Sequence, residues 1–191
     1  MREPNPVVLR FAPTLLLRAQ GIKVLFLDVD GVLTDGGIYF QECAEPRGAA
    51  ETIKRFNTLD GHGLKLLQRA SITPVVITGR DSRALRVRLE ALGVTRAHFG
   101  VEHKSSVATR VLGELGLGWA EAAAMGDDWP DLGMLRACTL ACAPSNAHLE
   151  VKACAHHVTA VRGGDGAVRE VVDLLLMASG LYTTLLEDAS S

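Results

Sequence analysis

The chain has 191 residues, 48% of them hydrophobic, and a formal net charge of -2 at pH 7. This length suits one domain, residues 1–191, and the near-balanced charge gives no electrostatic basis for binding nucleic acid or an anionic membrane. No apolar run approaches the ~18 residues that span a bilayer, and a chain this long needs no disulfide staples for its four cysteines. We therefore expect a cytoplasmic protein with reduced thiols that binds neither nucleic acid nor membrane.

The first long apolar run ends on two acidic residues. A short helix is predicted over residues 13–21, and the run at 24–27 lacks polar alternation, which is typical of a strand covered on both faces of a parallel sheet. Asp28 and Asp30 follow it directly. A carboxylate at the edge of an apolar core must be paired, hydrogen-bonded or bound to a metal. We interpret this pair as part of a divalent-metal site.

The next segment is predicted as a β-hairpin, about residues 38–56, with a long, turn-rich tip. An isolated hairpin is only marginally stable in water, so we expect it to lean on another surface, and we favour a neighbouring subunit. A helix is predicted over residues 64–70. Asp60 is a candidate cap for that helix, and His62 lies in the loop before it.

Strands then alternate with helices to the end of the chain. The predicted strands are 74–80, 97–99, 122–125, 139–143 and one from Val158, and the predicted helices are 81–92, one carrying residues 107–115, 134–137, 147–154 and 167–178. Residues 161–191 are predicted as a C-terminal tail, with a flexible loop at 161–166 and a frayed end at 187–191. The alternation predicts an α/β fold with a Rossmann-like, doubly wound parallel sheet, whose ligands lie beyond the carboxyl ends of its strands.

The predicted strand ends bring together carboxylates, a hydroxyl and an amine: Asp28, Asp30, Thr78, Lys104, Asp127, Asp128 and Asp131. Several carboxylates at one edge repel each other unless a divalent cation neutralises them, and oxygen ligands suit Mg²⁺. A lysine and a hydroxyl beside such a metal suit phosphoryl transfer. Asp28 can form an aspartyl-phosphate, and Asp30, which points the same way in an extended segment, can exchange protons with the leaving alcohol and with water.

Each of these residues also has an ordinary structural interpretation. Thr78 could cap a helix, Lys104 could be an exposed lysine, and Asp131 is more often a cap than a ligand. Arg80 faces either substrate or a surface partner, and His62 is most often a loop histidine. The convergence of the set on one sheet edge favours a site.

Four ordered motifs resemble those of the haloacid dehalogenase-like phosphatases: DVDGVLTDG from Asp28, TGR at 78–80, Lys104, and GDDWPD at 126–131. The resemblance implies that Asp28 is nucleophile and Mg²⁺ ligand, and that Asp30 is acid/base and binds the metal through its backbone carbonyl. It implies Asp127 as a further metal ligand, with Asp128 or Asp131 supporting metal-bound water. The candidate phosphate- and substrate-binding residues are Thr78, Gly79, Arg80, Lys104, Asp60 and His62.

Longer stretches, among them FNTLDGHGLKLL and GGDGAVREVVDLLL, resemble a capless branch of these enzymes. That branch dephosphorylates 3-deoxy-D-manno-octulosonate 8-phosphate, a sugar-acid phosphate and lipopolysaccharide precursor. It implies a homotetramer built through the hairpin, with the C-terminal tail of one subunit over its neighbour's site. Two interpretations of Arg162 and Arg169 then stay open: they contact the sugar acid, or they form surface salt bridges.

Three positions depart from that branch: a longer hairpin tip at 41–50, Asp165 in place of Arg in a GGRG motif, and Gly133 in place of Pro. Asp165 removes a cation that would lie beside the carboxylate of a sugar acid. Two alternative functions stay open. One is a phosphatase of a nine-carbon ulosonate 9-phosphate, and the other is a non-catalytic oligomerisation domain of the same fold.

Overall fold

The computed structural model describes residues 11–41 and 50–189. The predicted hairpin tip falls largely on residues 42–49, outside the described part of the chain, and so do residues 190–191 of the predicted frayed end.

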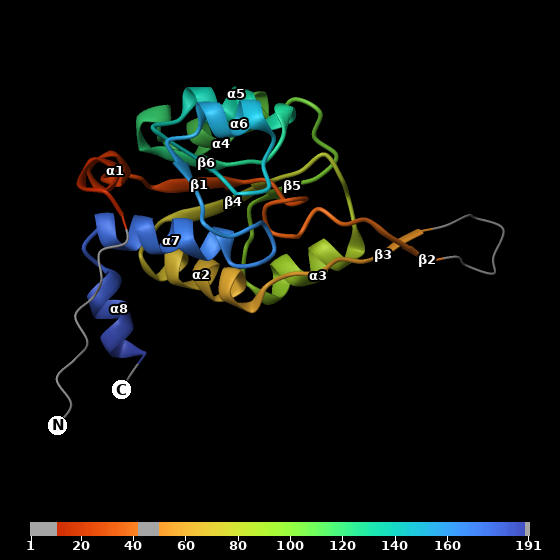
Figure 1. The fold of residues 1–191 in the computed structure, drawn as a ribbon, viewed down its shortest axis with the longest axis horizontal. Helices are drawn as coiled ribbons and strands as arrows, with labels where there is room; N and C mark the ends of the chain where they lie inside the picture. The colour runs from red at the N-terminus through yellow and green to blue at the C-terminus, as the bar shows by residue number, and fades with distance from the viewer. Residues whose placement is uncertain (1–10, 42–49, 190–191) are drawn as a thin grey trace.

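A six-stranded sheet with the strand order β5-β4-β1-β6-β7-β8 forms the centre of the molecule (Figure 1). Every strand pair in it is parallel. All residues of β1 are fully buried, as expected for a strand covered on both faces. The predicted doubly wound α/β fold is therefore confirmed. The strands are β1 Val24–Leu27, β4 Thr73–Ile77, β5 Ala97–His98, β6 Ala122–Met125, β7 Leu140–Ala143 and β8 His157–Val158.

Helices cover both faces of the sheet (Figure 1). Successive residues of β1 point to opposite faces, so Leu25 and Leu27 pack in one core cluster and Val24 and Phe26 in the other. The first cluster is shared with α1 Pro13–Ala19, α2 Thr58–Arg69, α3 Arg83–Ala91 and α7 Ala167–Ala178, and the second with α4 Lys104–Leu115, α5 Leu132–Ala137 and α6 Leu149–Cys154.

A hairpin and a last helix flank this core. The predicted hairpin is present as β2 Tyr39–Gln41 paired antiparallel with β3 Ala50–Ile53, and it projects from the body of the molecule (Figure 1). A last helix, α8 Tyr182–Asp188, follows α7. No helix within the described ranges combines the length and the apolar character needed to cross a membrane.

The start of α2 differs from the prediction. The helix begins at Thr58, capped by the side chain of Asn57, which accepts a hydrogen bond from the backbone N–H of Leu59 at 2.8 Å. The prediction of Asp60 as its cap was wrong. Gly61 and Gly63 lie inside the helix, where glycine is intrinsically unfavourable, but they allow neighbours to approach closely, because a Cβ on Gly61 would collide with the guanidinium of Arg88.

Much of the predicted C-terminal tail packs into or against the core. Gly163 and Gly164 are buried against the loop of residues 31–35, so the prediction of a flexible loop was wrong. Helix α7 buries a complete apolar face against α2 and α1, and α8 includes Glu187 and Asp188, which were predicted as frayed. Glycine suggested mobility in the sequence, whereas in the fold it permits backbone-to-backbone packing.

The contact of Gly163 should be essential for stability. A Cβ at this position would overlap the carbonyl oxygen of Gly31, so we expect Gly163→Ala to lower the free energy of unfolding by about 1–3 kcal/mol. Equilibrium denaturation in urea measures the change. The matched control is Gly113→Ala in α4, where the added methyl group meets nothing within 4 Å. It should leave stability unchanged or raise it by up to about 1 kcal/mol. Equal effects of the two variants would contradict the packing argument.

Candidate active site

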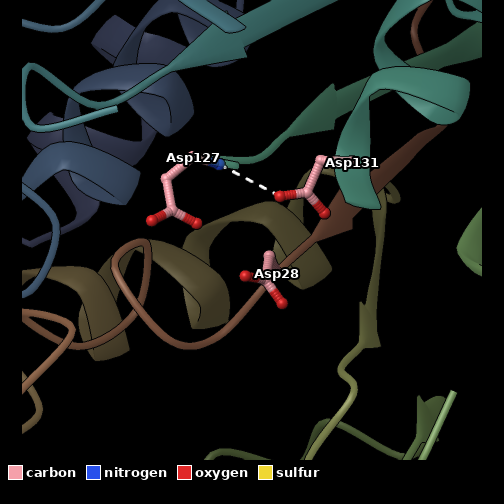
Figure 2. Close-up of side chains that lie close together, drawn as sticks. All are labelled: Asp28, Asp127 and Asp131. Carbon is pink, nitrogen blue, oxygen red and sulfur yellow. Dashed lines mark hydrogen bonds between the residues drawn. The ribbon is translucent and has the colours of Figure 1, made fainter. Parts of the chain in front are cut away.

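Three carboxylates meet beyond the ends of β1 and β6 (Figure 2). One oxygen each from Asp28, Asp127 and Asp131 lies within 4.8 Å of the others. Asp28 directly follows β1, and Asp127 follows β6, which pairs with β1 from Val24↔Ala122 to Leu27↔Met125. The parallel pairing therefore delivers both acids to one edge of the sheet.

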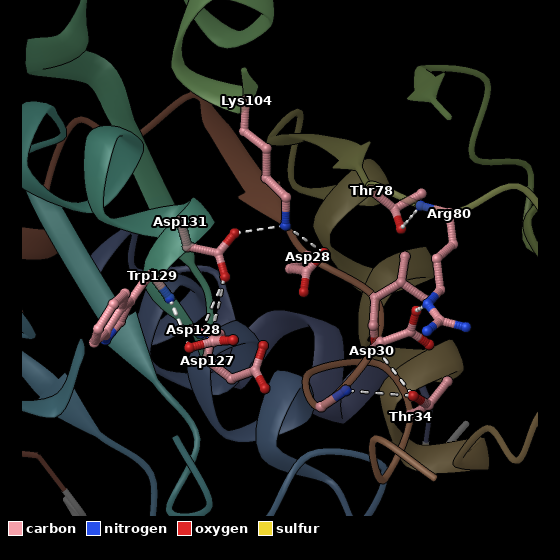
Figure 3. A network of polar contacts seen from close by, with 12 residues as sticks. Asp28, Asp30, Thr34, Thr78, Arg80, Lys104, Asp127, Asp128, Trp129 and Asp131 are labelled. Carbon is pink, nitrogen blue, oxygen red and sulfur yellow. Dashed lines mark hydrogen bonds and ion pairs between the residues drawn. The ribbon is translucent and has the colours of Figure 1, made fainter. Parts of the chain in front are cut away.

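Lys104 binds two members of this acidic trio, defined as Asp28, Asp127 and Asp131 (Figure 3). It is the first residue of α4, and its side chain is only 5% exposed. Its Nζ lies 2.6 Å from Oδ1 of Asp28 and 2.7 Å from Oδ1 of Asp131. The alternative of an ordinary exposed lysine is therefore wrong, and the amine is held inside the acidic cluster.

Asp131 has two roles in this arrangement. Its Oδ1 faces Lys104, while its Oδ2 accepts hydrogen bonds from the backbone N–H groups of Asp127 at 3.1 Å and Asp128 at 3.3 Å. It therefore caps the turn, as the sequence suggested, and also belongs to the trio. The side chain of Asp128 lies on the exposed side of this turn, where it accepts a hydrogen bond from the backbone N–H of Trp129.

Burial and mutual repulsion raise the pKa values of two members of the trio. The pKa of Asp28 is raised from 3.8 to about 6, because burial and the charge of Asp131 raise it more than Lys104 lowers it. Burial, followed by the charges of Asp28 and Asp131, raises the pKa of Asp127 to about 8. Burial alone would lower the pKa of Lys104, but its two carboxylate partners outweigh burial and raise it.

A divalent cation fits this donor set. Mg²⁺ prefers oxygen ligands and carboxylates, and its charge would offset the repulsion that raises the pKa values of Asp28 and Asp127. The side chain of Asp30 lies outside the trio. Its predicted metal contact, through the backbone carbonyl, stays a prediction.

Asp30 lies between two cations. Its Oδ1 is 2.5 Å from Nζ of Lys54. Its Oδ2 is 3.6 Å from Nε of Arg80 (Figure 3). Arg80 is thus placed beside the predicted acid/base. Thr78 is buried at the end of β4, where its hydroxyl oxygen accepts a hydrogen bond from the backbone N–H of Arg80 at 3.2 Å, and Gly79 lies between them.

Comparison with known proteins agrees with this geometry. A family model described as haloacid dehalogenase-like hydrolase matches residues 100–171. The 3-deoxy-D-manno-octulosonate 8-phosphate phosphatase of Salmonella typhimurium is 36% identical over 169 residues, which are 88% of this chain and 87% of that protein.

Solved structures give the same result. The phosphatase of this name from Moraxella catarrhalis, in complex with a magnesium ion, a phosphate ion and KDO, has a TM-score of 0.85 and 32% identity, over 92% of this chain and 97% of that one. The cobalt-bound enzyme from Haemophilus influenzae has a TM-score of 0.80 and 36% identity, over 87% and 94% of the chains. The chain belongs to the 3-deoxy-D-manno-octulosonate 8-phosphate phosphatase family.

Within this family member, two predicted substrate residues lie beside α7. The carboxylate of Asp60 is buried and accepts hydrogen bonds from the backbone N–H groups of Gly166 at 3.3 Å and Arg169 at 2.8 Å, and burial raises its pKa. His62 lines a small cavity with residues of α7 and α8. The structure therefore gives Asp60 a structural role at the start of α7 and does not bring either residue into the acidic trio.

The arginines of the C-terminal segment also have different surroundings. Arg169 forms an ion pair with Asp173, at 2.8 Å between Nε and Oδ1, one helical turn further along α7. Arg169 therefore forms a salt bridge, and its predicted contact with the sugar acid stays a prediction. Arg162 is exposed, and its predicted contact with substrate stays a prediction.

Sequence reasoning missed Lys54 and Asn146. Asn146 donates a hydrogen bond from Nδ2 to the carbonyl of Gly31 at 3.0 Å, and its Oδ1 accepts one from the N–H of Gly163 at 2.7 Å. Its position just after β7, the neighbour of β6, was a usable signal, because that strand ends at the same edge. Lys54 gave no comparable signal, since it lies in a β-prone run of the hairpin.

The raised pKa values predict how stability depends on pH. Between the unfolded value of 3.8 and the folded values of about 6 for Asp28 and about 8 for Asp127, the folded state binds more protons than the unfolded chain. The stability that these two groups contribute is therefore lost as the pH rises through that window. We expect the melting temperature in EDTA to fall between about pH 5 and pH 8, by about 2–4 °C for each kcal/mol lost.

Mg²⁺ should raise the melting temperature more at the higher pH, because metal ligands must be deprotonated. Differential scanning fluorimetry with EDTA or Mg²⁺ across this range measures both effects. Asp127→Asn is the matched variant: it removes the carboxyl group whose pKa is raised to about 8, so its melting temperature should vary less with pH and respond less to Mg²⁺. An identical profile for the variant and the wild type would refute the assignment.

Proposed function

We propose that this chain is a Mg²⁺-dependent phosphatase that hydrolyses 3-deoxy-D-manno-octulosonate 8-phosphate to the free sugar acid and inorganic phosphate, in lipopolysaccharide precursor synthesis. The observation that carries the proposal is the acidic trio closed by Lys104 at the carboxyl edge of the sheet. Relatives that carry this activity in their names match most of the chain.

The reaction proceeds through Asp28. Its carboxylate attacks the phosphorus atom, and the bond between phosphorus and the sugar oxygen breaks while Asp30 gives a proton to that oxygen. Water then attacks the phosphorus of the aspartyl-phosphate, Asp30 takes a proton from it, and the bond to Asp28 breaks to release phosphate. Asp30 thus acts first as acid and then as base, which needs a carboxyl group held close to Asp28.

The other residues orient Asp28 and the phosphate group and offset negative charge. Lys104 holds Oδ1 of Asp28 by a charge-assisted hydrogen bond and adds a positive charge next to the phosphate position. Thr78 and Gly79, at the end of β4 beside β1, are the proposed phosphate contacts. Mg²⁺ would be held by Asp28, Asp127 and the backbone of Asp30, with Asp131 in support. Its positive charge would offset the negative charge of the phosphoryl oxygens.

The alternative functions have less support. A non-catalytic oligomerisation domain has no need for a buried lysine between two buried carboxylates, since such a cluster is costly unless it is used. A nine-carbon ulosonate substrate is disfavoured because the relatives are named for the eight-carbon acid.

The purified protein should release phosphate from 3-deoxy-D-manno-octulosonate 8-phosphate with Mg²⁺ and not with EDTA. Asp28→Asn should lower kcat by on the order of 10³-fold or more, because an amide cannot form the aspartyl-phosphate. A phosphate-release assay measures both effects. The control is Asp188→Asn, a surface acid of α8 paired with Arg69, which should keep wild-type activity.

Two outcomes would contradict this proposal. If Asp28→Asn still released phosphate, Asp28 would not be the nucleophile. If kcat/KM were higher for a nine-carbon ulosonate 9-phosphate than for the eight-carbon substrate, the protein would still be a phosphatase, but the proposed substrate would be wrong.

We also propose that the enzyme is a homotetramer assembled through the hairpin and that it works in the cytoplasm. Tyr39 and Phe40 in β2 and Ile53 in β3 are exposed hydrophobic residues, and Phe40 is 65% exposed. Such a cluster on a projecting hairpin suits burial against another subunit. The described cysteines, Cys138, Cys142 and Cys154, form no disulfide, which suits a reducing compartment.

Phe40→Glu should weaken this assembly, because it places a charge in the proposed interface while leaving the core untouched. Light scattering should give a mass close to four subunits for the wild type and a smaller one for the variant. Val158→Glu, at another partly exposed hydrophobic residue far along the chain, is the control and should keep the wild-type mass. A monomeric wild type would reject the tetramer.

A further inference from the structure

Lys54 is a buried lysine at the end of the hairpin. It follows β3 directly, and its side chain is 1% exposed. Lysine is seldom buried this completely without a partner, because removing an ammonium group from water is costly. Its Nζ lies 2.5 Å from Oδ1 of Asp30, so the ammonium group and the carboxylate form a close, charge-assisted contact.

This contact dominates the orientation of the Asp30 carboxylate. The second cation, Arg80, is 3.6 Å from the other oxygen and its side chain is 46% exposed, so solvent weakens its hold. Lys54 is at hydrogen-bond distance and shielded from solvent. The carboxylate is therefore fixed mainly from the hairpin side.

The hairpin is itself attached to the catalytic loop. An antiparallel bridge joins Thr34 to Phe56, two residues after Lys54. Thr34 in turn accepts hydrogen bonds from the backbone N–H groups of Gly31 at 3.4 Å and Gly36 at 3.3 Å. The chain that carries Lys54 and the loop that carries Asp30 thus form one connected unit.

We propose that Lys54 is a positioning residue that holds the carboxylate of Asp30 where it exchanges protons with the leaving oxygen and with water. This inference rests on the proposed phosphatase function and assigns the hairpin a part in the chemistry. The adjacent Arg55 offers a natural comparison, because its ion pairs go to Asp165 at 2.7 Å and Asp35 at 3.6 Å and not to Asp30.

Substrates that differ in their leaving group isolate this role. The sugar oxygen of the eight-carbon substrate needs a proton as it leaves, whereas p-nitrophenolate does not, and kcat/KM reports the steps up to the first irreversible one. We expect Lys54→Met to lower kcat/KM by about 10²-fold or more for the sugar phosphate and by less than about 10-fold for p-nitrophenyl phosphate. Lys54→Arg, which keeps a cation, should retain more activity on the sugar phosphate than Lys54→Met.

A double-mutant cycle then tests whether Lys54 acts through Asp30. If it does, the variant with both Asp30→Asn and Lys54→Met should be no slower than Asp30→Asn alone. Arg55→Gln loosens a neighbouring hairpin contact without touching Asp30, so its effect should be the same on both substrates. Circular dichroism checks the fold of each variant, and if Lys54→Met does not fold, Lys54→Gln against Lys54→Arg makes the same comparison.

Equal losses on the two substrates, or additive effects in the double variant, would overturn the role of Lys54 while leaving the phosphatase intact. A wild-type protein that releases phosphate from neither ester would instead overturn the proposed function, and the role of Lys54 with it.

Discussion

Excess negative charge at the ends of β1 and β6 is the constraint on which the site depends. The trio places oxygens of Asp28, Asp127 and Asp131 within 4.8 Å of each other, and Lys104 contacts only Asp28 and Asp131 at ion-pair distance among the described residues. Burial, together with the charges of Asp28 and Asp131, raises the pKa of Asp127 to about 8. Catalytic sites often store such electrostatic strain, and a bound divalent cation relieves it.

The same loop is held from parts of the chain far away in sequence. Asn146 connects the carbonyl of Gly31 with the N–H of Gly163, and the N–H of Gly164 donates to the carbonyl of Val32 at 3.1 Å. Asp60 then fixes the start of α7. The C-terminal segment therefore supports the loop that carries Asp30, and it does so within one subunit.

Charge in the C-terminal loop differs from that expected for this family branch. Asp165, which stands where the resemblance implied Arg, forms an ion pair with Arg55 of the hairpin end. Lys54 and Arg55 are adjacent in sequence, yet one reaches into the site and the other reaches the C-terminal loop. The departure at Asp165 thus has a partner in this chain, and the hairpin connects with both regions.

The sequence by itself determined the strand and helix order, the parallel sheet, and the acids that follow β1 and β6, because apolar runs and their polar ends depend on local pattern. It did not show that Gly61 and Gly63 lie inside α2, that Gly163 packs on Gly31, or that Lys54 pairs with Asp30. Each of these depends on a neighbour remote in sequence. By itself, a glycine favours a turn and a lysine favours a position in solvent. Here the backbone of Gly31 packs on Gly163 and the carboxylate of Asp30 pairs with Lys54, and both contacts exist only in the folded structure.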